Sequence, residues 1–278
     1  MSAILFFRLL VPFAFGNFLG AFYRSVNAVV GPDIVTELHL TAEDIGLLTS
    51  IVFLFYAGVQ IPLGMMLDRF GARRVTASLF ALAGVSALVF SQAENFTVLL
   101  ITRAAMGIGI SAAFMGALKA VAESMPRDQL PLGNSVIMAM GGLGVMSATI
   151  PVQYALHFTD WRGIFIAIAA MTFMIATAIY TITPDGSGAS VTPPGGSLRG
   201  VIEVFTNRDF LRMVPLGSSA QGVNMAMSGL WAGPWLRDVA GLTRNEAAAV
   251  LFGMAGCIAL SVFLIGGLAQ RLARAGFP

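Results

Sequence analysis

Long apolar stretches constrain the fold of this chain more than any other feature. A helix crosses a hydrocarbon core with about 20 mainly apolar residues. Eight stretches meet or approach that length, and short polar connections join them. They are Phe7–Val30, Ile45–Met66, Val75–Phe90, Phe96–Leu118, Gly133–Ala155, Ile164–Ile182, Met213–Leu236 and Ala247–Ala269. Because the chain is 57% hydrophobic and 11% charged, a soluble fold could not cover its apolar surface. We predict an all-α membrane protein with eight transmembrane helices.

Basic residues predict the orientation of these helices. If the N-terminus is cytoplasmic, eleven of the 16 Lys and Arg residues lie on the cytoplasmic side, as the positive-inside rule requires. We therefore predict an inner-membrane protein with both termini in the cytoplasm. The basic residues are spread among short loops, which argues against a nucleic-acid partner. The single cysteine, Cys257, lies in the eighth stretch, so we predict no disulfide framework and no thiol metal site. We also predict no enzymatic activity, no cofactor and no bound metal.

An internal repeat relates the two parts of the chain at an offset of 202 residues. Two of the matched segments have a threonine N-cap followed three residues later by an acid. The matches are Gly20 with Gly222, Gly31-Pro32 with Gly233-Pro234, Thr41 and Asp44 with Thr243 and Glu246, and Gly64, Asp68 and Arg69 with Gly266, Gln270 and Arg271. Such duplication is typical of transporters built from repeated helical units.

The repeat and one low-complexity stretch predict the domain organisation. Pro184–Ser197 is rich in glycine, proline and serine, a composition typical of a flexible linker. We predict a six-helix bundle over residues 1–183, a cytoplasmic linker over 184–211, and an incomplete second repeat over 212–278 that contains two of six helices. A further C-terminal half is therefore an expected partner, and membrane lipid surrounds the helices.

A glycine and aspartate pattern lies between the second and third stretches. It runs Gly64-Met-Met-Leu-Asp68-Arg69-Phe-Gly71-Ala-Arg73-Arg74, and it resembles the cytoplasmic signature of the major facilitator superfamily. Gly64 would let helices approach closely, Gly71 would permit a tight turn, and Asp68 would accept hydrogen bonds. The resemblance implies a conformational latch formed by Gly64, Asp68, Arg69, Gly71, Arg73 and Arg74. Positive-inside placement alone would explain the arginines but not the glycine-aspartate spacing.

Two further patterns resemble parts of the same family. Arg103, followed by Gly107 and Gly109, is similar to a signature of the fourth helix. Tyr23-Arg24-x-x-Asn27 is similar to the first helix of anion-transporting branches, including the organic-phosphate and anion–cation symporter families. Met146-Ser147 stands where the antiporter signature has Gly-Pro, which weakens a drug-efflux interpretation.

Arg24 and Arg103 are the two arginines that lie well inside predicted spans, where a charge costs at least a few kcal/mol. Both are eight residues from an outer helix end, so they lie at similar depth. The family resemblance places their helices around one central cavity, which implies that both guanidinium groups face the same aqueous space. No Asp, Glu or His lies well inside a span, so the pair favours an anion with bidentate geometry. The alternative is that the arginines snorkel to the interface or cap backbone carbonyls.

These patterns predict a permease that moves a small anion by alternating access. The predicted substrate-binding residues are Arg24, Arg103 and Asn27, with neutral contacts from Gln221 and Asn224 on the seventh helix. Coupling is left open between a proton, a sodium ion and a counter-anion, because no buried proton carrier is evident. The alternatives are a truncated remnant or split-transporter subunit that does not transport alone, and a cation or drug efflux transporter.

Overall fold

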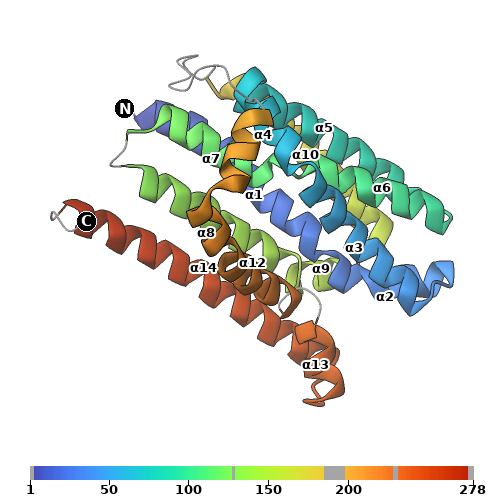
Figure 1. Ribbon diagram of the computed structural model, residues 1–278. Coiled ribbons are helices and arrows are strands. Elements are labelled where there is room, and N and C mark those ends of the chain that lie inside the picture. The colour runs from blue at the N-terminus through green and yellow to red at the C-terminus, as the bar shows by residue number, and fades with distance from the viewer. Residues whose placement is uncertain (1–2, 127–128, 185–197, 228–230, 275–278) are drawn as a thin grey trace.

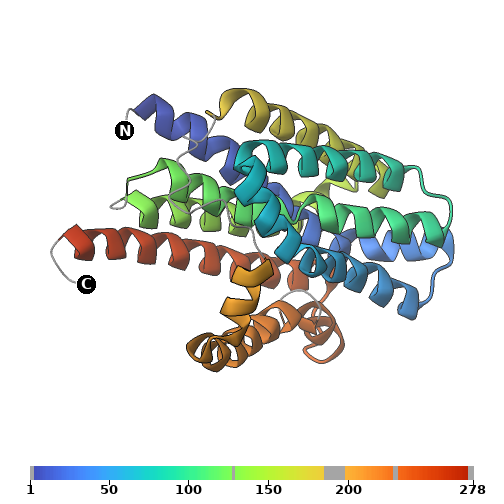
Figure 2. The same cartoon turned by 45° about the horizontal axis from the view of Figure 1, so that its top comes forward.

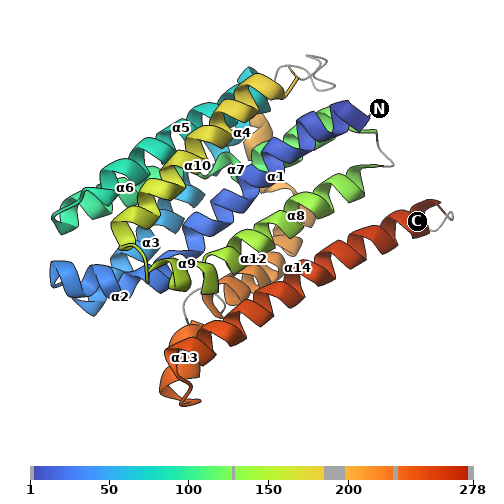
Figure 3. The ribbon, with the colours of Figure 1, turned by 180° about the vertical axis from the view of Figure 1, so that it is seen from behind.

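The structure is a computed structural model that describes residues 3–126, 129–184, 198–227 and 231–274. All regular elements within those ranges are helices. The long helices run side by side in a bundle, and both chain ends lie at the same end of it (Figure 1). We call this the terminal end, and we call the end where α2 (Asn27–Leu38) and α9 (Ile150–Ala155) lie the opposite end (Figure 3).

The first six predicted stretches all form helices. Four of them are divided in two by a short break. The elements are α1 (Ala3–Ser25) and α2, α3 (Ala42–Gly58) and α4 (Gln60–Phe70), α5 (Ala72–Ser91), α6 (Phe96–Gly109) and α7 (Ala112–Ser124), α8 (Leu130–Ser147) and α9, and α10 (Trp161–Ile182).

Two of the breaks bend the helix sharply. The chain turns by 43° between α1 and α2, and by 46° between α3 and α4. The second bend has a local cause, because Pro62 lies in the first turn of α4. A proline has no N–H to donate to the carbonyl four residues earlier, here Gly58, and its ring clashes with that carbonyl. The first bend lies at Val26, directly between Arg24 and Asn27.

Small residues bring the central helices close together. α1 packs against α8, α3 against α6, and α5 against both α6 and α10. A Cβ at Gly144 would collide with the backbone of Phe18, and a Cβ at Gly107 would collide with the backbone of Val52. Glycine at such crossings allows the backbone contact that drives helix association in membranes. The two predicted charged helices, α1 and α6, are therefore tightly held within the bundle.

The C-terminal helices are α11 (Leu198–Thr206), α12 (Arg208–Ala226), α13 (Ala232–Asp238) and α14 (Arg244–Arg274). α14 packs along α8, as Figure 3 shows. In Figure 2, α12 lies on the side of α14 that faces away from α5 and α10. α11 and the start of α12 fall within the predicted linker 184–211 and are helical, whereas residues 185–197 of that linker lie outside the described residues.

The predicted helix starts of the repeat are confirmed in both copies. Thr41 accepts a hydrogen bond from the Asp44 backbone N–H at 3.2 Å, and Asp44 accepts from the Thr41 N–H at 2.8 Å. Thr243 and Glu246 make the same pair of bonds at 3.3 and 2.8 Å. Each pair is a capping box, which satisfies donors that the helix itself leaves free.

Within the described residues, four helices are long and apolar enough to span a membrane, or six if each bent pair counts as one span. The prediction of an all-helical membrane fold is therefore confirmed, while the count of eight spans is not. The difference lies in the seventh and eighth stretches. α12 and α13 are two separate helices in that region. Within the described residues, the apolar segment of α14 is Asn245–Ile258, which is shorter than a candidate span.

Candidate functional site

The bend in the first span lies beside Arg24, at the end of α1. The Arg24 guanidinium carbon is 5.4 Å from the centroid of the Tyr56 ring on α3, within the range of a cation–π contact. Its Nη1 atom is buried and has no hydrogen-bond partner among the described residues. A guanidinium carries five N–H donors, so this arginine retains donor capacity for a ligand.

Arg103 on α6 has a different environment. Its side chain is 1% exposed, and its guanidinium carbon lies 4.7 Å from the Phe90 ring centroid and 5.2 Å from that of Phe165. The residue is thus enclosed in the six-helix bundle. Its role in substrate binding stays a prediction.

Asn27 is brought into direct contact with Arg103. The Arg103 Nη2 atom donates to Asn27 Oδ1 at 2.5 Å, and Asn27 Nδ2 donates to Thr49 Oγ1 at 2.9 Å. The Thr49 hydroxyl in turn donates to the Ile45 carbonyl at 2.9 Å. This chain of hydrogen bonds joins α6, α2 and α3 around the first residue of α2. Thr49 was not predicted from the sequence, since no local pattern distinguishes it from other apolar-helix threonines.

Gln221 and Asn224 lie elsewhere. Both side chains are exposed on α12, whereas Arg103 is enclosed by the N-terminal bundle. The structure therefore brings Arg103 and Asn27 together and places Gln221 and Asn224 on the surface of another helix. Their contribution to substrate binding is untested.

The signature between α4 and α5 forms a charged cluster at the terminal end. Asp68 accepts from the Lys119 ammonium at 2.5 Å, and Lys119 also pairs with Glu123 at 3.1 Å. Gly71 has φ 79°, the left-handed conformation that glycine adopts without steric cost. Gly64 differs from expectation, because a Cβ there would meet nothing within 4 Å. In this structure Gly64 is not a point of close helix approach.

Arg73 and Arg69 of this signature both lie over aromatic rings. The Arg73 Nε atom donates to the Tyr180 carbonyl at 2.6 Å, and its guanidinium lies over the Tyr180 ring at 5.2 Å. Arg69 lies over the Phe70 ring, and Arg74 is exposed. Lys119, which was not predicted as a site residue, is the partner of Asp68. The one feature of the sequence that could have pointed to Lys119 is its position as an isolated lysine at the end of an apolar stretch.

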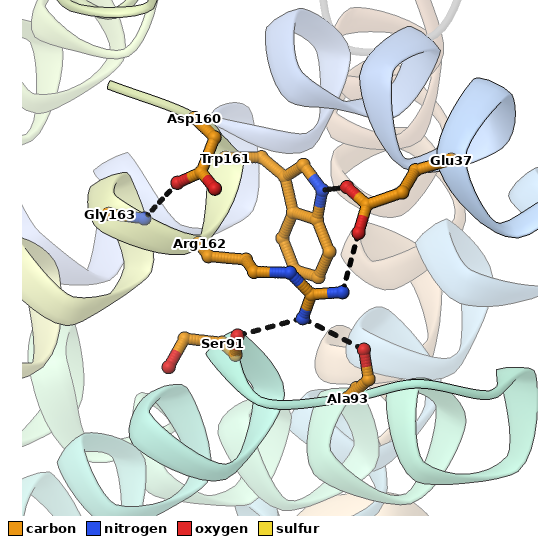
Figure 4. Close-up of polar contacts among 7 residues, drawn as sticks. All are labelled: Glu37, Ser91, Ala93, Asp160, Trp161, Arg162 and Gly163. Carbon is orange, nitrogen blue, oxygen red and sulfur yellow. Dashed lines mark hydrogen bonds and ion pairs between the residues drawn. The ribbon is translucent and has the colours of Figure 1, made fainter. Parts of the chain in front are cut away.

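A second polar network lies at the opposite end of the bundle (Figure 4). Glu37, in the last turn of α2, accepts from Arg162 Nη2 and from Trp161 Nε1, each at 2.6 Å. Arg162 Nη1 donates to the Ser91 and Ala93 carbonyls, each at 2.9 Å. We call Glu37, Trp161 and Arg162 the opposite-end network. It ties α2 to the start of α10 and to the end of α5.

A family model described as the Major Facilitator Superfamily matches residues 13–277. The chain belongs to the major facilitator superfamily. This is a family of membrane transporters rather than enzymes, in agreement with the resemblance found in the sequence.

Individual relatives are similar over part of their length. An uncharacterized transporter, YybO, of Bacillus subtilis is 28% identical over 56% of this chain and 36% of its own length. The probable sulfoacetate transporter SauU of Cupriavidus necator is 29% identical over 55% of this chain and 36% of its own length. The chain thus matches about a third of each of these curated relatives.

Solved structures support the fold. A bacterial homologue of the human lysosomal transporter Spinster, in an inward-facing and unoccupied conformation, has a TM-score of 0.74 and 20% sequence identity. That similarity covers 100% of this chain and 65% of the other. At this level of identity the comparison shows the helical architecture of the superfamily.

Proposed function

We propose that this chain is part of a permease that moves a small anionic solute by alternating access, with Arg24 as the residue that contacts the anion. The observation that carries the proposal is the buried Nη1 atom of Arg24, which has no partner among the described residues. Substrate then supplies the missing acceptor. Arg103 and Asn27 contribute to the same site, and Gln221 and Asn224 add neutral contacts when α12 lies against the bundle.

Charge balance favours an anion at this site. An arginine inside a span is costly unless something compensates its charge. The described contacts of Arg24 and Arg103 involve aromatic rings and one amide oxygen, without a carboxylate. A carboxylate, sulfonate or nitrate would accept the two parallel hydrogen bonds that a guanidinium offers. The ring of Tyr56 holds one face of the Arg24 guanidinium while leaving its edge for the anion.

The names of several relatives support the same class of solute. Besides the probable sulfoacetate transporter, they include a probable L-galactonate transporter of Escherichia coli at 26% identity and a nitrate/nitrite transporter of Nostoc punctiforme at 28%. Others are named for efflux or for facilitated glucose transport. A test of substrate must therefore include a sugar and an organic cation beside the anions.

Orientation in an inner membrane is part of the proposal. Both termini and the segment 184–197 would be cytoplasmic, which is consistent with the two chain ends lying at one end of the bundle in Figure 1. Coupling would involve a proton, a sodium ion or a counter-anion. Reporter fusions within 184–197 test the orientation, and a periplasmic signal there would contradict it.

The direct test is a binding panel on the purified chain. Radiolabelled sulfoacetate, galactonate and nitrate are compared with D-xylose and with tetraphenylphosphonium, a lipophilic cation. We expect at least one anion to bind and the sugar and cation not to bind. Arg24→Gln weakens that binding by one to two powers of ten, whereas Arg237→Gln, which removes an exposed charge on α13, leaves it unchanged. Binding of the cation alone would favour the efflux alternative, and binding of nothing would favour a subunit that needs a further half.

A further inference from the structure

The first span is divided between Arg24 and Asn27. Arg24 is the second-last residue of α1, and Asn27 is the first residue of α2. Val26 between them is 0% exposed, and the chain turns by 43° there. The direction in which α1 leaves this bend decides where the Arg24 side chain points. A group that fixes the start of α2 therefore acts on Arg24 without touching it.

Asn27 is fixed at both ends of its amide. Its Oδ1 accepts from Arg103 and its Nδ2 donates to Thr49. Each of these partners is on a different helix, α6 for Arg103 and α3 for Thr49. The side chain has no freedom to turn without leaving one buried polar group unpaired, which is costly in an apolar environment. The start of α2 is thus held in one orientation.

Arg103 is shielded from any solute by the bundle itself. Its side chain is 1% exposed and lies against the Phe90 and Phe165 rings, both of which belong to the buried core around it. We propose that Arg103 is a positioning residue, which acts on the anion site through its hydrogen bond to Asn27 rather than by contacting the anion. This inference rests on the proposed function of Arg24 as the anion contact.

Pre-organisation is the physical advantage of this arrangement. A guanidinium that is already aimed at its site loses less conformational freedom when the anion binds. Without Arg103 or Asn27, the start of α2 samples more orientations and Arg24 samples more positions. Replacing Arg103 and replacing Asn27 both break the same hydrogen bond, so the double variant should behave like either single variant. If Arg103 contacted the anion directly, the double variant would bind the anion more weakly than either single variant.

The first experiment needs no knowledge of the substrate. Phenylglyoxal modifies exposed arginine, and mass spectrometry of the full chain gives the rate at Arg24. Asn27→Ala and Arg103→Met each raise that rate about tenfold, the change expected when one hydrogen bond to a charged group is lost, and the double variant raises it no further. Arg103→Lys, which keeps a donor for Asn27, restores most of the wild-type rate.

Asn17→Ala is the matched control. Asn17 is also a buried asparagine of the first span, and its Nδ2 donates to the Ile137 carbonyl at 2.8 Å. It lies ten residues before Asn27, about 15 Å along the helix. This variant loses the same kind of bond without touching the bend, so the Arg24 rate stays at the wild-type value. An equal rise in Asn17→Ala and Asn27→Ala would overturn the proposal, because general loosening would explain both.

The second experiment separates this inference from the proposed function. Sulfoacetate and nitrate are added to the wild-type chain, and protection of Arg24 from phenylglyoxal is measured. Absence of protection argues against Arg24 as the anion contact, while the rates without anion still report on positioning. If protection occurs, the anion concentration for half protection is compared across Asn27→Ala, Arg103→Met and the double variant. Equal values support positioning, and a further weakening in the double variant shows direct contact by Arg103 and overturns it.

Discussion

Arg162 and Arg103 both donate hydrogen bonds to α2, one in its last turn and one at its first residue, but they differ in what balances their charge. Arg162 meets the Glu37 carboxylate and two backbone carbonyls at a half-exposed position. Arg103 is fully buried and meets one amide and two aromatic rings. A guanidinium whose donors reach a carboxylate has little left for a ligand. This difference supports a structural role for the opposite-end network and is consistent with the anion site that we propose around the bend.

The largest expected effect is on anion binding, which should depend on Arg24 at the bend and not on Arg162 in the opposite-end network. Arg24→Gln removes a charge-assisted contact worth about 1.5–3 kcal/mol, which weakens anion binding by one to two powers of ten. Arg24→Lys is intermediate, because lysine keeps the charge and loses the planar fork. Arg162→Gln leaves binding unchanged within error. Equilibrium binding of radiolabelled sulfoacetate measures all three, and an equal loss in Arg162→Gln and Arg24→Gln would erase the distinction.

The opposite-end network is expected to show its effect in stability. Arg162→Ala lowers the free energy of unfolding by about 1–2 kcal/mol, a value reduced for partial exposure of the pair. Glu37→Gln costs less, since an amide oxygen still accepts from Trp161. Thermal unfolding in detergent measures both, with Glu94→Gln as an exposed control on the same end.

A double-mutant cycle sharpens this result. Glu37 and Arg162 share one ion pair, so the double variant should lose less than the sum of the two single variants. Additive losses would mean that each residue acts through separate contacts. The network would then not be the unit that Figure 4 suggests.

Much of this fold could be predicted from the sequence because the evidence was local. Apolar length located the helices, and a threonine followed three residues later by an acid located both helix starts. Gly71 was expected at a tight turn, and its φ of 79° confirms it. In each case one short segment contains all the groups that decide the structure.

The long-range polar contacts could not be predicted in the same way. Glu37 and Arg162 are 125 residues apart in sequence, and Asp68 and Lys119 are 51 apart. The direction of the Arg103 side chain could not be predicted either, because a uniformly apolar helix gives no periodic signal for its buried side. The direction of the Arg103 side chain depends on Phe90 and Phe165, which come from two other helices.

A smaller effect on stability is expected for Arg103→Met. Loss of the bond to Asn27 costs about 1–3 kcal/mol, and relief from burying a charge without a carboxylate offsets most of it. The net change in the free energy of unfolding is within about 1 kcal/mol. Thermal unfolding beside Arg162→Ala checks this. A larger loss from Arg103→Met would make Arg103 a main support of the bundle and would reverse the comparison.

The smallest effect is expected at the terminal end, where Asp68 pairs with Lys119. The side chains are 55% and 23% exposed, and an exposed ion pair contributes about 0–1 kcal/mol. Lys119 also keeps Glu123 as a partner one helical turn away. Asp68→Asn therefore changes thermal stability by no more than about 0.5 kcal/mol at low salt, and the difference disappears in about 1 M salt because the charges are screened. A salt-independent loss would show that Asp68 holds the turn through its hydrogen bonds rather than its charge, and the terminal end would then resemble the opposite-end network in kind.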